Sequence, residues 1–448
     1  MNKAIERRQR RDAHAIFRAA LEAADPARAI ARMVRLDGEV LHAGPYRFDL
    51  SRVRTIQVVG AGKASATMAA AVEKLLGRRV AGGLVNTKYG HLAKVRRVEL
   101  HEAGHPVPDE AGIAGARRIA EIARVAGPDD LLIALISGGA SALLPLPAAP
   151  VTLEEKQAAT KLMLACGATI NEINCVRKHI SGIKGGQLAR LAAPAALLAL
   201  LLSDVIGDPL DVIGSGPAAP DDSTFEQAWE VFEKYDITPR MPASVRARIE
   251  AGRRGEIEET PKPGDACFRR TRNLVVGSNR QAVDAAVAKA KELGYRPLVL
   301  STLIEGETRE IAAMHCAIAR EALLSGRPAK PPACLISGGE TTVTLKGEGK
   351  GGRNMEFALA AAVALDGADQ VLAFSAGTDG TDGPTDAAGA WASGATAGRA
   401  REMGLDPQAA LRENDSYPFF KAIDGLVMTG PTGTNVMDVR LMLVGAPG

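Results

Sequence analysis

Continuous apolar runs recur along the chain, and each ends abruptly in a loop rich in glycine, serine or aspartate. Six are clear: TIQVVGAGKAS (55–65), LLIALISGGAS (131–141), LLALLLSDVIGD (197–208), NLVVGSN (273–279), ACLISGGET (333–341) and QVLAFSAGTDG (370–380). Apolar runs without alternation are typical of strands buried on both faces. Alanine-rich segments with helical spacing follow most of the loops. This order of strands and helices predicts α/β domains with largely parallel sheets.

A polar, proline-bearing stretch without periodicity, residues 251–266, interrupts this pattern. The chain has 448 residues, which is more than one ordinary core holds and suits two domains of about 200 residues each. We therefore expect an N-terminal Rossmann-like domain over residues 1–262. A smaller C-terminal α/β domain is expected over residues 263–448.

Composition narrows the classes of function. The net charge is only +3 and aromatic residues make up 4%, so neither a basic field nor a base-stacking platform for nucleic acid is expected. The longest apolar run, residues 191–202, is shorter than the roughly 20 residues that cross a bilayer, so no membrane association is expected. Five scattered cysteines without metal-ligand spacing, and an N-terminus without a signal-peptide pattern, favour the cytoplasm.

The first glycine-rich loop invites a nucleotide interpretation, but the standard templates fail. A P-loop needs glycine where Gln57 stands and a hydroxyl where Ala64 stands, and a dinucleotide fingerprint needs its third glycine where Ser65 stands. What remains is Lys63 at the start of a helix, beside backbone amides that favour an anion. For any single loop of this kind, a simple chain reversal through glycine is the alternative.

Two further segments are basic and rich in glycine. VRKHISGIKGGQLA (176–189) carries Arg177, Lys178 and Lys184, which either supply positive charge to an anionic substrate or form a solvated helix face. KGEGKGGRNMEFALA (346–360) leads through glycines into Arg353 and Asn354 at a helix start. Because a guanidinium binds planar anions through two donors, this pattern suits phosphate or carboxylate; the alternative is a hairpin tip.

Acidic loops follow two of the predicted strands. SAGTDGTDGPTDAAGA (375–390) carries Asp379, Asp382 and Asp386, and SDVIGDPLDVIGSGP (203–217) begins with Asp204 after its serine. Carboxylates in a flexible loop suit Mg²⁺ held together with substrate phosphates, whereas an Asx-turn loop is the structural alternative. Positive and acidic loops on two domains together indicate phosphoryl transfer, which relies on positioning and charge neutralisation.

The motifs GAGKAS, GHPVPDE, LISGGASALL, VRKHISGIKGGQLA, SDVIGDPLDVIGSGP, SGGETTVT, GKGGRN and SAGTDGTDGPTDAAGA occur in this order over nearly the whole chain. In this they closely resemble the class II glycerate kinases, the glycerate 2-kinase family, whose members often carry the label hydroxypyruvate reductase. The resemblance implies ATP-dependent, Mg²⁺-requiring phosphorylation of D-glycerate to 2-phosphoglycerate, with the active site in the cleft between two α/β domains. It also places the family's lysine, aspartate and arginine on Lys63, Asp204 and Arg353.

We therefore expect Lys63, Asp204 and Arg353 to be catalytic. The residues expected to bind glycerate or ATP are Gly62, Ser65, Ser137, Gly138, Gly139, Ser141, Arg177, Lys178, Lys184, Asn279, Gly338, Gly339, Glu340 and Asn354. Arg177, Lys178 and Lys184 are the candidates to anchor the glycerate carboxylate, and Asp379, Asp382 and Asp386 to bind Mg²⁺. The alternatives are an NAD(P)H-dependent hydroxypyruvate reductase and a non-catalytic sugar-phosphate sensor. The oligomeric state is open, with a homodimer among the candidates.

Overall fold

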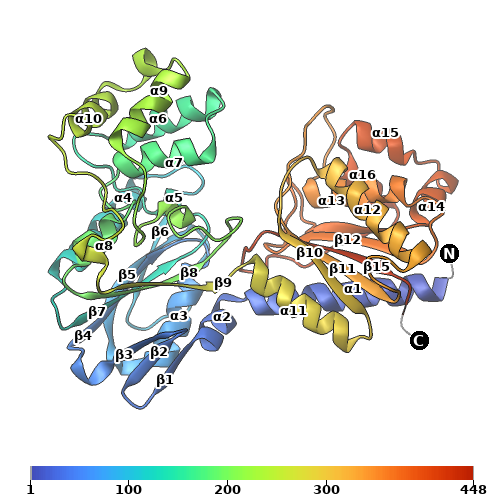
Figure 1. The fold of residues 1–448 in the computed structure, drawn as a ribbon, viewed down its shortest axis with the longest axis horizontal. Helices are drawn as coiled ribbons and strands as arrows, with labels where there is room; N and C mark the ends of the chain where they lie inside the picture. The colour runs from blue at the N-terminus through green and yellow to red at the C-terminus, as the bar shows by residue number, and fades with distance from the viewer. Residues whose placement is uncertain (1–2, 447–448) are drawn as a thin grey trace. The chain divides into compact units, whose positions relative to one another are not determined.

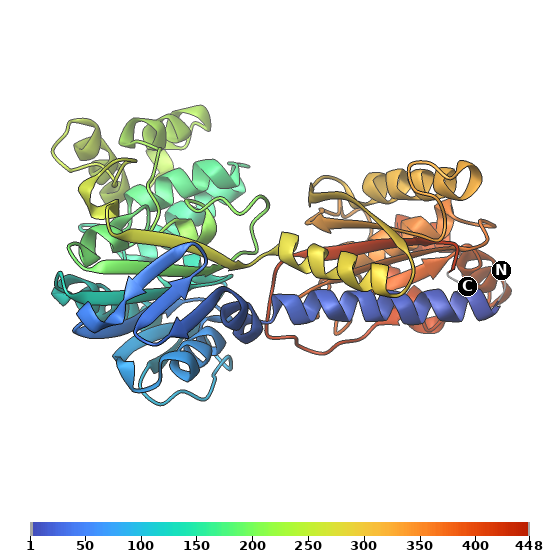
Figure 2. The ribbon, with the colours of Figure 1, turned by 60° about the horizontal axis from the view of Figure 1, so that its bottom comes forward.

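The computed structural model describes residues 3–446, which form two compact units (Figure 1). The central unit comprises residues 29–276, and the terminal unit comprises residues 3–28 together with residues 277–446. The division therefore lies later than residue 262, because the strand that ends at Gly277 belongs to the sheet of the central unit. The N-terminal helix α1 (Lys3–Ala24) packs beside α11 (Asn279–Glu292) in the terminal unit (Figure 2).

A six-stranded sheet forms the core of the central unit. Its order is β6 (Glu99–Ala103), β5 (Val80–Lys88), β4 (Thr55–Ala61), β7 (Asp130–Ile136), β8 (Ala196–Leu202) and β9 (Thr271–Gly277). The neighbours from β6 through β8 are all parallel, as expected. Strand order reverses between β4 and β7. In open α/β sheets ligands bind at such a reversal, beyond the carboxyl ends of the strands.

Helices and a small sheet complete the central unit. Helices that contact strands of the main sheet include α3 (Ser65–Leu76), α4 (Glu110–Val125), α5 (Ala140–Leu143) and α8 (Gln187–Ala192). The short strands β1 (Val34–Asp37), β2 (Val40–Ala43) and β3 (Tyr46–Asp49) form an antiparallel sheet that follows α2 (Pro26–Met33). A helical layer with its own apolar core contains α6 (Leu153–Ala165), α7 (Ile170–His179), α9 (Phe225–Lys234) and α10 (Ala243–Arg253).

The terminal unit contains a mixed sheet rather than the largely parallel one that the sequence suggested. Its order is β10 (Arg296–Ile304), β11 (Ala333–Gly339), β15 (Asp438–Val444), β12 (Val371–Gly377), β13 (Gly389–Ser393) and β14 (Leu426–Val427). Of these neighbours only β10 and β11 are parallel. The last strand, β15, inserts antiparallel between β11 and β12, and β12 reaches β13 without a helix between them. For both reasons the prediction of a largely parallel sheet, made from the alternation of strands and helices, is wrong for this unit.

Helices cover both faces of the terminal sheet. Figure 2 shows α1 and α11 together on one face. On the other face, α12 (Thr308–Ser325) and α13 (Arg353–Ala364) pack with β11, β12 and β15 in one apolar core. The remaining helices are α14 (Thr396–Glu402), α15 (Pro407–Arg412) and α16 (Ser416–Ala422). All six apolar runs predicted as strands are strands. Within residues 3–446, no helix combines the length and apolarity needed to span a membrane.

Candidate functional site

The loops after β4 and β7 are joined to each other at the strand-order reversal. The N–H of Lys63 donates to the carbonyl of Gly138 at 2.9 Å, and the N–H of Ala64 donates to Oγ of Ser137 at 3.1 Å. Oγ of Ser65 lies 3.0 Å from Oγ of Ser137, and both serines are buried. Gly62 and the two serines therefore hold the two loops in register, because a Cβ at Gly62 would lie 2.1 Å from Oγ of Ser137.

The turn at Gly138 and Gly139 brings together side chains from three loops. A Cβ at Gly138 would lie 2.3 Å from Oδ2 of Asp204, so this carboxylate rests directly on the turn. A Cβ at Gly139 would lie 2.9 Å from Nε2 of His105 and 3.4 Å from Cγ of Lys63. Lys63 and Asp204, both expected to be catalytic, thus flank the same turn, and His105 joins them from the loop after β6.

The electrostatics of this turn suit an anion next to a proton acceptor. Burial raises the pKa of Asp204, and the positive charge of Lys63 partly offsets that rise. Burial, together with the charge of Lys63, lowers the pKa of His105 to about 4, so its imidazole is neutral at pH 7. Within residues 3–446, no acceptor faces the N–H groups of Gly138 and Gly139. Free amides at a turn before a helix are donors for phosphate oxygens.

A cavity of about 830 Å³ opens beside this turn, lined by Gly139, Ser141, helix α6 and residues around α7. Three of its lining side chains, Lys156, Arg177 and Lys184, form a group that we call the cationic pocket. Lys156 is 5% exposed and Lys184 is 0% exposed, and the Nζ atoms of both lack a hydrogen-bond partner among the described residues. Lys184 and Arg177 were expected from the sequence to bind an anion, whereas Lys156 was not.

Two neighbouring residues that were expected to bind a ligand already contact other protein side chains. The ammonium of Lys178 lies 2.9 Å from Oδ2 of Asp211 and 3.2 Å from Oδ1 of Asp221, so its charge is neutralised away from the cationic pocket. Oγ of Ser141 lies 3.0 Å from Oγ of Ser215 while the residue still lines the cavity. The structure thus brings Arg177 and Lys184 together, and it does not bring Lys178 with them.

In the terminal unit, Arg353 begins α13 and is held by two carboxylates. Its Nε and Nη2 donate to the two oxygens of Asp438 at 2.7 and 3.0 Å, and its Nη1 lies 2.8 Å from Oε1 of Glu340. Asn354 donates to Oδ1 of Asp438 at 2.9 Å and accepts from Oγ of Ser375 at 2.6 Å. These contacts orient the guanidinium at the edge of a second cavity, about 400 Å³ in volume.

Three further candidates in this unit have backbone roles. Nδ2 of Asn279 donates to the carbonyls of Val436 and Asp438 at 2.9 Å each, and so ties α11 to β15. A Cβ at Gly338 would lie 1.7 Å from Oδ1 of Asn279, and a Cβ at Gly339 would lie 2.3 Å from a backbone oxygen. Both glycines therefore allow close packing. The two LISGG phrases consequently differ: the first ends in an open turn, and the second is strand β11 itself.

The three aspartates expected to bind Mg²⁺ do not converge. Asp382 is buried and accepts from the N–H groups of Asn354 and Met355 at the start of α13. Asp386 accepts from the hydroxyl of Tyr417 at 2.7 Å. Asp379 accepts from the N–H of Thr381, at 3.1 Å, and is half-buried. Within residues 3–446, no group of three or more His, Cys, Asp or Glu residues could hold a metal ion.

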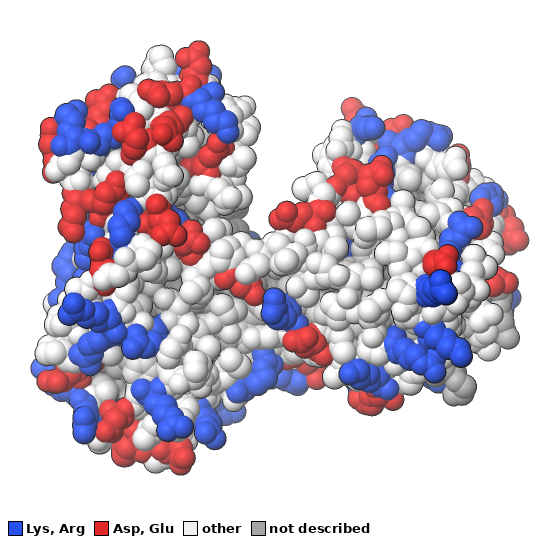
Figure 3. Space-filling model, in the orientation of Figure 1, with Lys and Arg blue, Asp and Glu red and all other residues white. Residues whose placement is uncertain are grey.

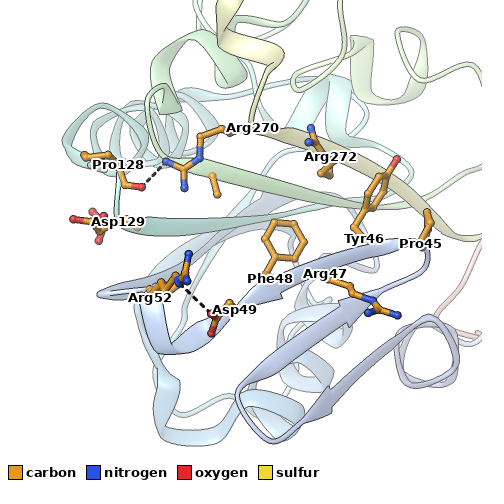
Figure 4. A pocket seen from close by; sticks show the side chains of 13 residues that line it. Pro45, Tyr46, Arg47, Phe48, Asp49, Arg52, Pro128, Asp129, Arg270 and Arg272 are labelled. Carbon is orange, nitrogen blue, oxygen red and sulfur yellow. Dashed lines mark hydrogen bonds and ion pairs between the residues drawn. The ribbon is translucent and has the colours of Figure 1, made fainter.

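Another cavity, of about 680 Å³, lies at the opposite edge of the central sheet (Figure 4). It is lined by the β3 segment Tyr46–Asp49, by Arg52, Arg270 and Arg272, and by residues at the starts of β7 and β8. Arg52 pairs with Asp49 at 3.3 Å, and Arg270 donates to the carbonyl of Pro128. Because this edge holds the amino ends of the parallel strands, we do not assign the catalytic site to this cavity.

Basic and acidic side chains intermingle over the face of the molecule seen in Figure 3, consistent with the small net charge.

Comparisons with known proteins place the chain in a family. A family model described as a domain of unknown function (DUF4147) matches residues 12–250, and the model of the MOFRL family matches residues 333–438. A glycerate 2-kinase of Pyrococcus horikoshii is 42% identical over 427 residues, which cover 95% of each chain. The chain belongs to the glycerate kinase family.

The solved structures extend this glycerate kinase relationship to the fold. A crystal structure of a glycerate kinase from Thermotoga maritima matches with a TM-score of 0.87 and 42% identity, covering 97% of this chain and 99% of that one. A protein of Agrobacterium vitis named as a hydroxypyruvate reductase is 47% identical over 87% of each chain. The reductase name therefore also occurs among the relatives of this glycerate kinase family member.

Sequence reasoning missed three residues of the candidate site. His105 lay in a quoted motif, GHPVPDE, but a lone histidine carries no positional signal. Lys156 lies in helix α6 among other charged and polar residues, where a lysine normally marks a solvated face. Asp438 begins the last strand, far in the chain from Arg353, and no local pattern connects the two residues.

Proposed function

We propose that this chain transfers the γ-phosphoryl group of ATP to the C2 hydroxyl of D-glycerate, giving 2-phosphoglycerate and ADP. One observation carries the proposal: Lys63 and Asp204 flank the Gly138–Gly139 turn, whose N–H groups have no acceptor among residues 3–446 and can bind phosphate oxygens. A positive charge, free amides and a carboxylate around one small space are what phosphoryl transfer to an alcohol needs. Membership of the glycerate kinase family supports the same substrate pair.

Each side chain has a distinct role in this proposal. The ammonium of Lys63 neutralises charge on the transferred phosphoryl group. Asp204 accepts the proton of the attacking hydroxyl, and its raised pKa makes it a better base than an exposed aspartate. Arg353 offers a planar pair of N–H donors to a carboxylate or phosphate, with its orientation set by Asp438 and Glu340.

Mg²⁺ is the expected companion of ATP, and the chain offers it a limited set of ligands. Asp379 fits best, because it follows β12 and accepts one hydrogen bond, from the N–H of Thr381, which leaves oxygen lone pairs for a metal ion. Asp382 fits poorly, since its oxygens are occupied by the amides at the start of α13. A single protein carboxylate is consistent with a Mg²⁺ ion that is held mainly by the phosphates of the nucleotide. The ion would neutralise the charge of these phosphates.

The choice of the C2 hydroxyl is taken from the relatives named glycerate 2-kinase, and anchoring of the substrate carboxylate permits it. The carboxylate is the one fixed charge of glycerate, so a cationic side chain binds it and leaves the adjacent C2 hydroxyl little freedom. The C3 hydroxyl can still rotate away. Productive transfer requires the attacking oxygen within about 3–3.5 Å of phosphorus, and the more constrained hydroxyl meets this more often.

A coupled assay tests the proposal directly. The enzyme is incubated with D-glycerate, Mg²⁺ and ATP, together with enolase and pyruvate kinase but without phosphoglycerate mutase. We expect pyruvate to form, because 2-phosphoglycerate is the substrate of enolase. ADP release with pyruvate appearing only after mutase is added would assign the C3 hydroxyl instead. Oxidation of NADH by hydroxypyruvate, without ATP consumption in the presence of glycerate, would favour the reductase.

The cysteines bear on where the activity takes place. Since all five cysteines are free, we place the activity in a reducing cytoplasm.

A further inference from the structure

We infer that the cationic pocket, formed by Lys156, Arg177 and Lys184, binds the polyphosphate chain of the nucleotide, and that the adjoining apolar wall binds its base. This inference rests on the proposed function only in taking a nucleotide as a substrate. It assigns that nucleotide to the central unit, and it adds Lys156 to the binding residues.

The two lysines need an anion that the protein does not provide. The Nζ atoms of Lys156 and Lys184 are buried without a hydrogen-bond partner among the described residues. A buried ammonium without an acceptor is strongly destabilising, because it has lost water and gained nothing in return. Burial lowers the pKa of both lysines; the charge of Lys156 lowers that of Lys184 further, and the charge of Arg177 acts on both. Clusters of this kind persist at functional sites, where a ligand supplies the missing charge.

The charge of the pocket favours a polyphosphate over a monocarboxylate. The cavity lining contains four basic side chains, with Lys161 as the fourth, and one carboxylate, that of Glu154. Glu154 is exposed at the first turn of α6, where the N-terminal backbone and Thr152 stabilise its charge. His105 also lines the cavity, but it is neutral at pH 7. Glycerate carries one negative charge, whereas the phosphates of ATP or ADP carry several.

The size and the apolar wall favour a nucleoside. The volume of about 830 Å³ falls in the range of sites for molecules of that size, and it far exceeds a three-carbon acid. Val107 is 65% exposed and Leu164 is 61% exposed, although both line the cavity, and Pro106 and Pro108 extend the same wall. A planar base laid against this wall would cover apolar surface that water now contacts.

The position connects the pocket to the proposed chemistry. Gly139 and Ser141 line the cavity, and Gly139 belongs to the turn that Lys63 and Asp204 flank. A phosphate chain that starts on Lys156 and Lys184 and ends at the free amides of this turn would bring its terminal phosphorus to these two side chains.

Isothermal titration of the full-length protein tests the assignment with three probes: ADP, inorganic tripolyphosphate and D-glycerate. Lys184→Met and Lys156→Met remove one charge each and keep the volume. We expect each to raise the Kd of ADP and of tripolyphosphate about tenfold or more, as for loss of a charged hydrogen bond. The Kd of D-glycerate should change less than about twofold. Lys74→Met, an exposed lysine of α3 outside the cavity, is the matched control and should leave all values unchanged.

The base and phosphate arms are separated by a third variant, Val107→Ser. This variant should weaken the binding of ADP and leave the binding of tripolyphosphate unchanged. The assignment is overturned if both lysine variants bind ADP and tripolyphosphate like the wild type. It is equally overturned if they raise only the Kd of D-glycerate, which would make the pocket the carboxylate site. If wild-type protein consumes no ATP with glycerate, the proposed function fails, while the ADP titrations still decide the pocket.

Discussion

Arg353 and Asp438 form a two-point ion pair, with Nε to Oδ2 at 2.7 Å and Nη2 to Oδ1 at 3.0 Å. Asp438 is 0% exposed and also accepts from Arg440 at 3.0 Å and from Asn354 at 2.9 Å. One buried carboxylate at the start of β15 therefore organises two guanidinium groups and the first turn of α13. This fixed frame lets Arg353 present its remaining donors without reorganising.

Replacing Arg353 with lysine tests whether the planar geometry matters. Lysine keeps the charge but cannot pair with both oxygens of Asp438 and still offer aligned donors. We expect Arg353→Lys to lower kcat about 10²-fold in the glycerate kinase assay, typical for loss of a preorganised charge stabiliser. Arg412→Lys, at an exposed helix end, is the matched control. A lysine variant with wild-type kcat would show that only long-range charge is needed.

Neutralising Asp438 tests the frame itself. Asp438→Asn keeps the shape, but it leaves the fully buried guanidinium of Arg440 and that of Arg353 facing an uncharged amide. Breaking a buried ion pair from one side costs about 3–5 kcal/mol, so the free energy of unfolding should fall by that order. Urea unfolding monitored by fluorescence measures it. Asp424→Asn, whose carboxylate pairs with Arg10 at the surface, should change it by less than about 1 kcal/mol.

Sequence patterns predicted the elements of the central unit well, because its parallel sheet rests on local alternation of apolar runs and helices. They did not predict the terminal sheet, since the place of β15 between β11 and β12 is decided by pairing across the chain. Residues 3–24 similarly join the terminal unit through packing of α1 on α11, which no local signal carries.

The site shows the same division between local and non-local information. Lys63, the Gly138–Gly139 turn and Asp204 follow strands whose carboxyl ends meet at one sheet edge, so their proximity could be predicted. The spacing of Asp379, Asp382 and Asp386 suggested a metal cluster, yet each carboxylate has a different local partner. Lys178 and Lys184 looked equivalent in sequence. Only the placement of Asp211 and Asp221 separates a neutralised lysine from one without a partner.

Adding one methyl group at Gly138 should disturb catalysis without replacing any charged residue. The new Cβ would lie 2.3 Å from Oδ2 of Asp204, so the carboxylate must move away from the turn. We expect Gly138→Ala to lower kcat at least about tenfold, because misplacing a catalytic group by about 1 Å is costly. Gly398→Ala, where nothing lies within 4 Å, is the control and should be neutral. Unchanged kcat in Gly138→Ala would remove Asp204 from the proton-accepting role.

The Mg²⁺ requirement distinguishes the three aspartates of the loop after β12. Asp379→Asn should raise the Mg²⁺ concentration needed for half-maximal kinase activity several-fold, because an amide oxygen is a weaker ligand than a carboxylate. Asp386→Asn loses only its contact with Tyr417 and should titrate like the wild type. Both variants are titrated at fixed ATP with the thermal midpoint as a check on folding. If the two titrations coincide, Asp379 has a structural role.

Nucleotide binding should weaken as the pH rises above neutrality, because the cationic pocket must be protonated to bind phosphate. Burial and the charge of Arg177 lower the pKa of Lys156 to about 7, so much of this lysine is neutral above that pH in the free protein. The other groups that face it are Arg177, Lys184, Lys161, Glu154 and His105. Lys184 has a pKa lowered in the same sense, and His105 stays neutral throughout.

A bound polyphosphate raises the pKa of Lys156, so binding above pH 7 takes up a proton. By linkage, affinity then falls by up to about tenfold per pH unit for each proton taken up. Between pH 7.5 and 9 the charge of ADP is constant, since its last phosphate ionisation lies near pH 6. Isothermal titration in two buffers of different ionisation enthalpy measures the proton uptake. Lys156→Met should bind more weakly at pH 7.5 and show a shallower decline. An affinity that stays flat or rises over this range would mean that neither lysine charges on binding.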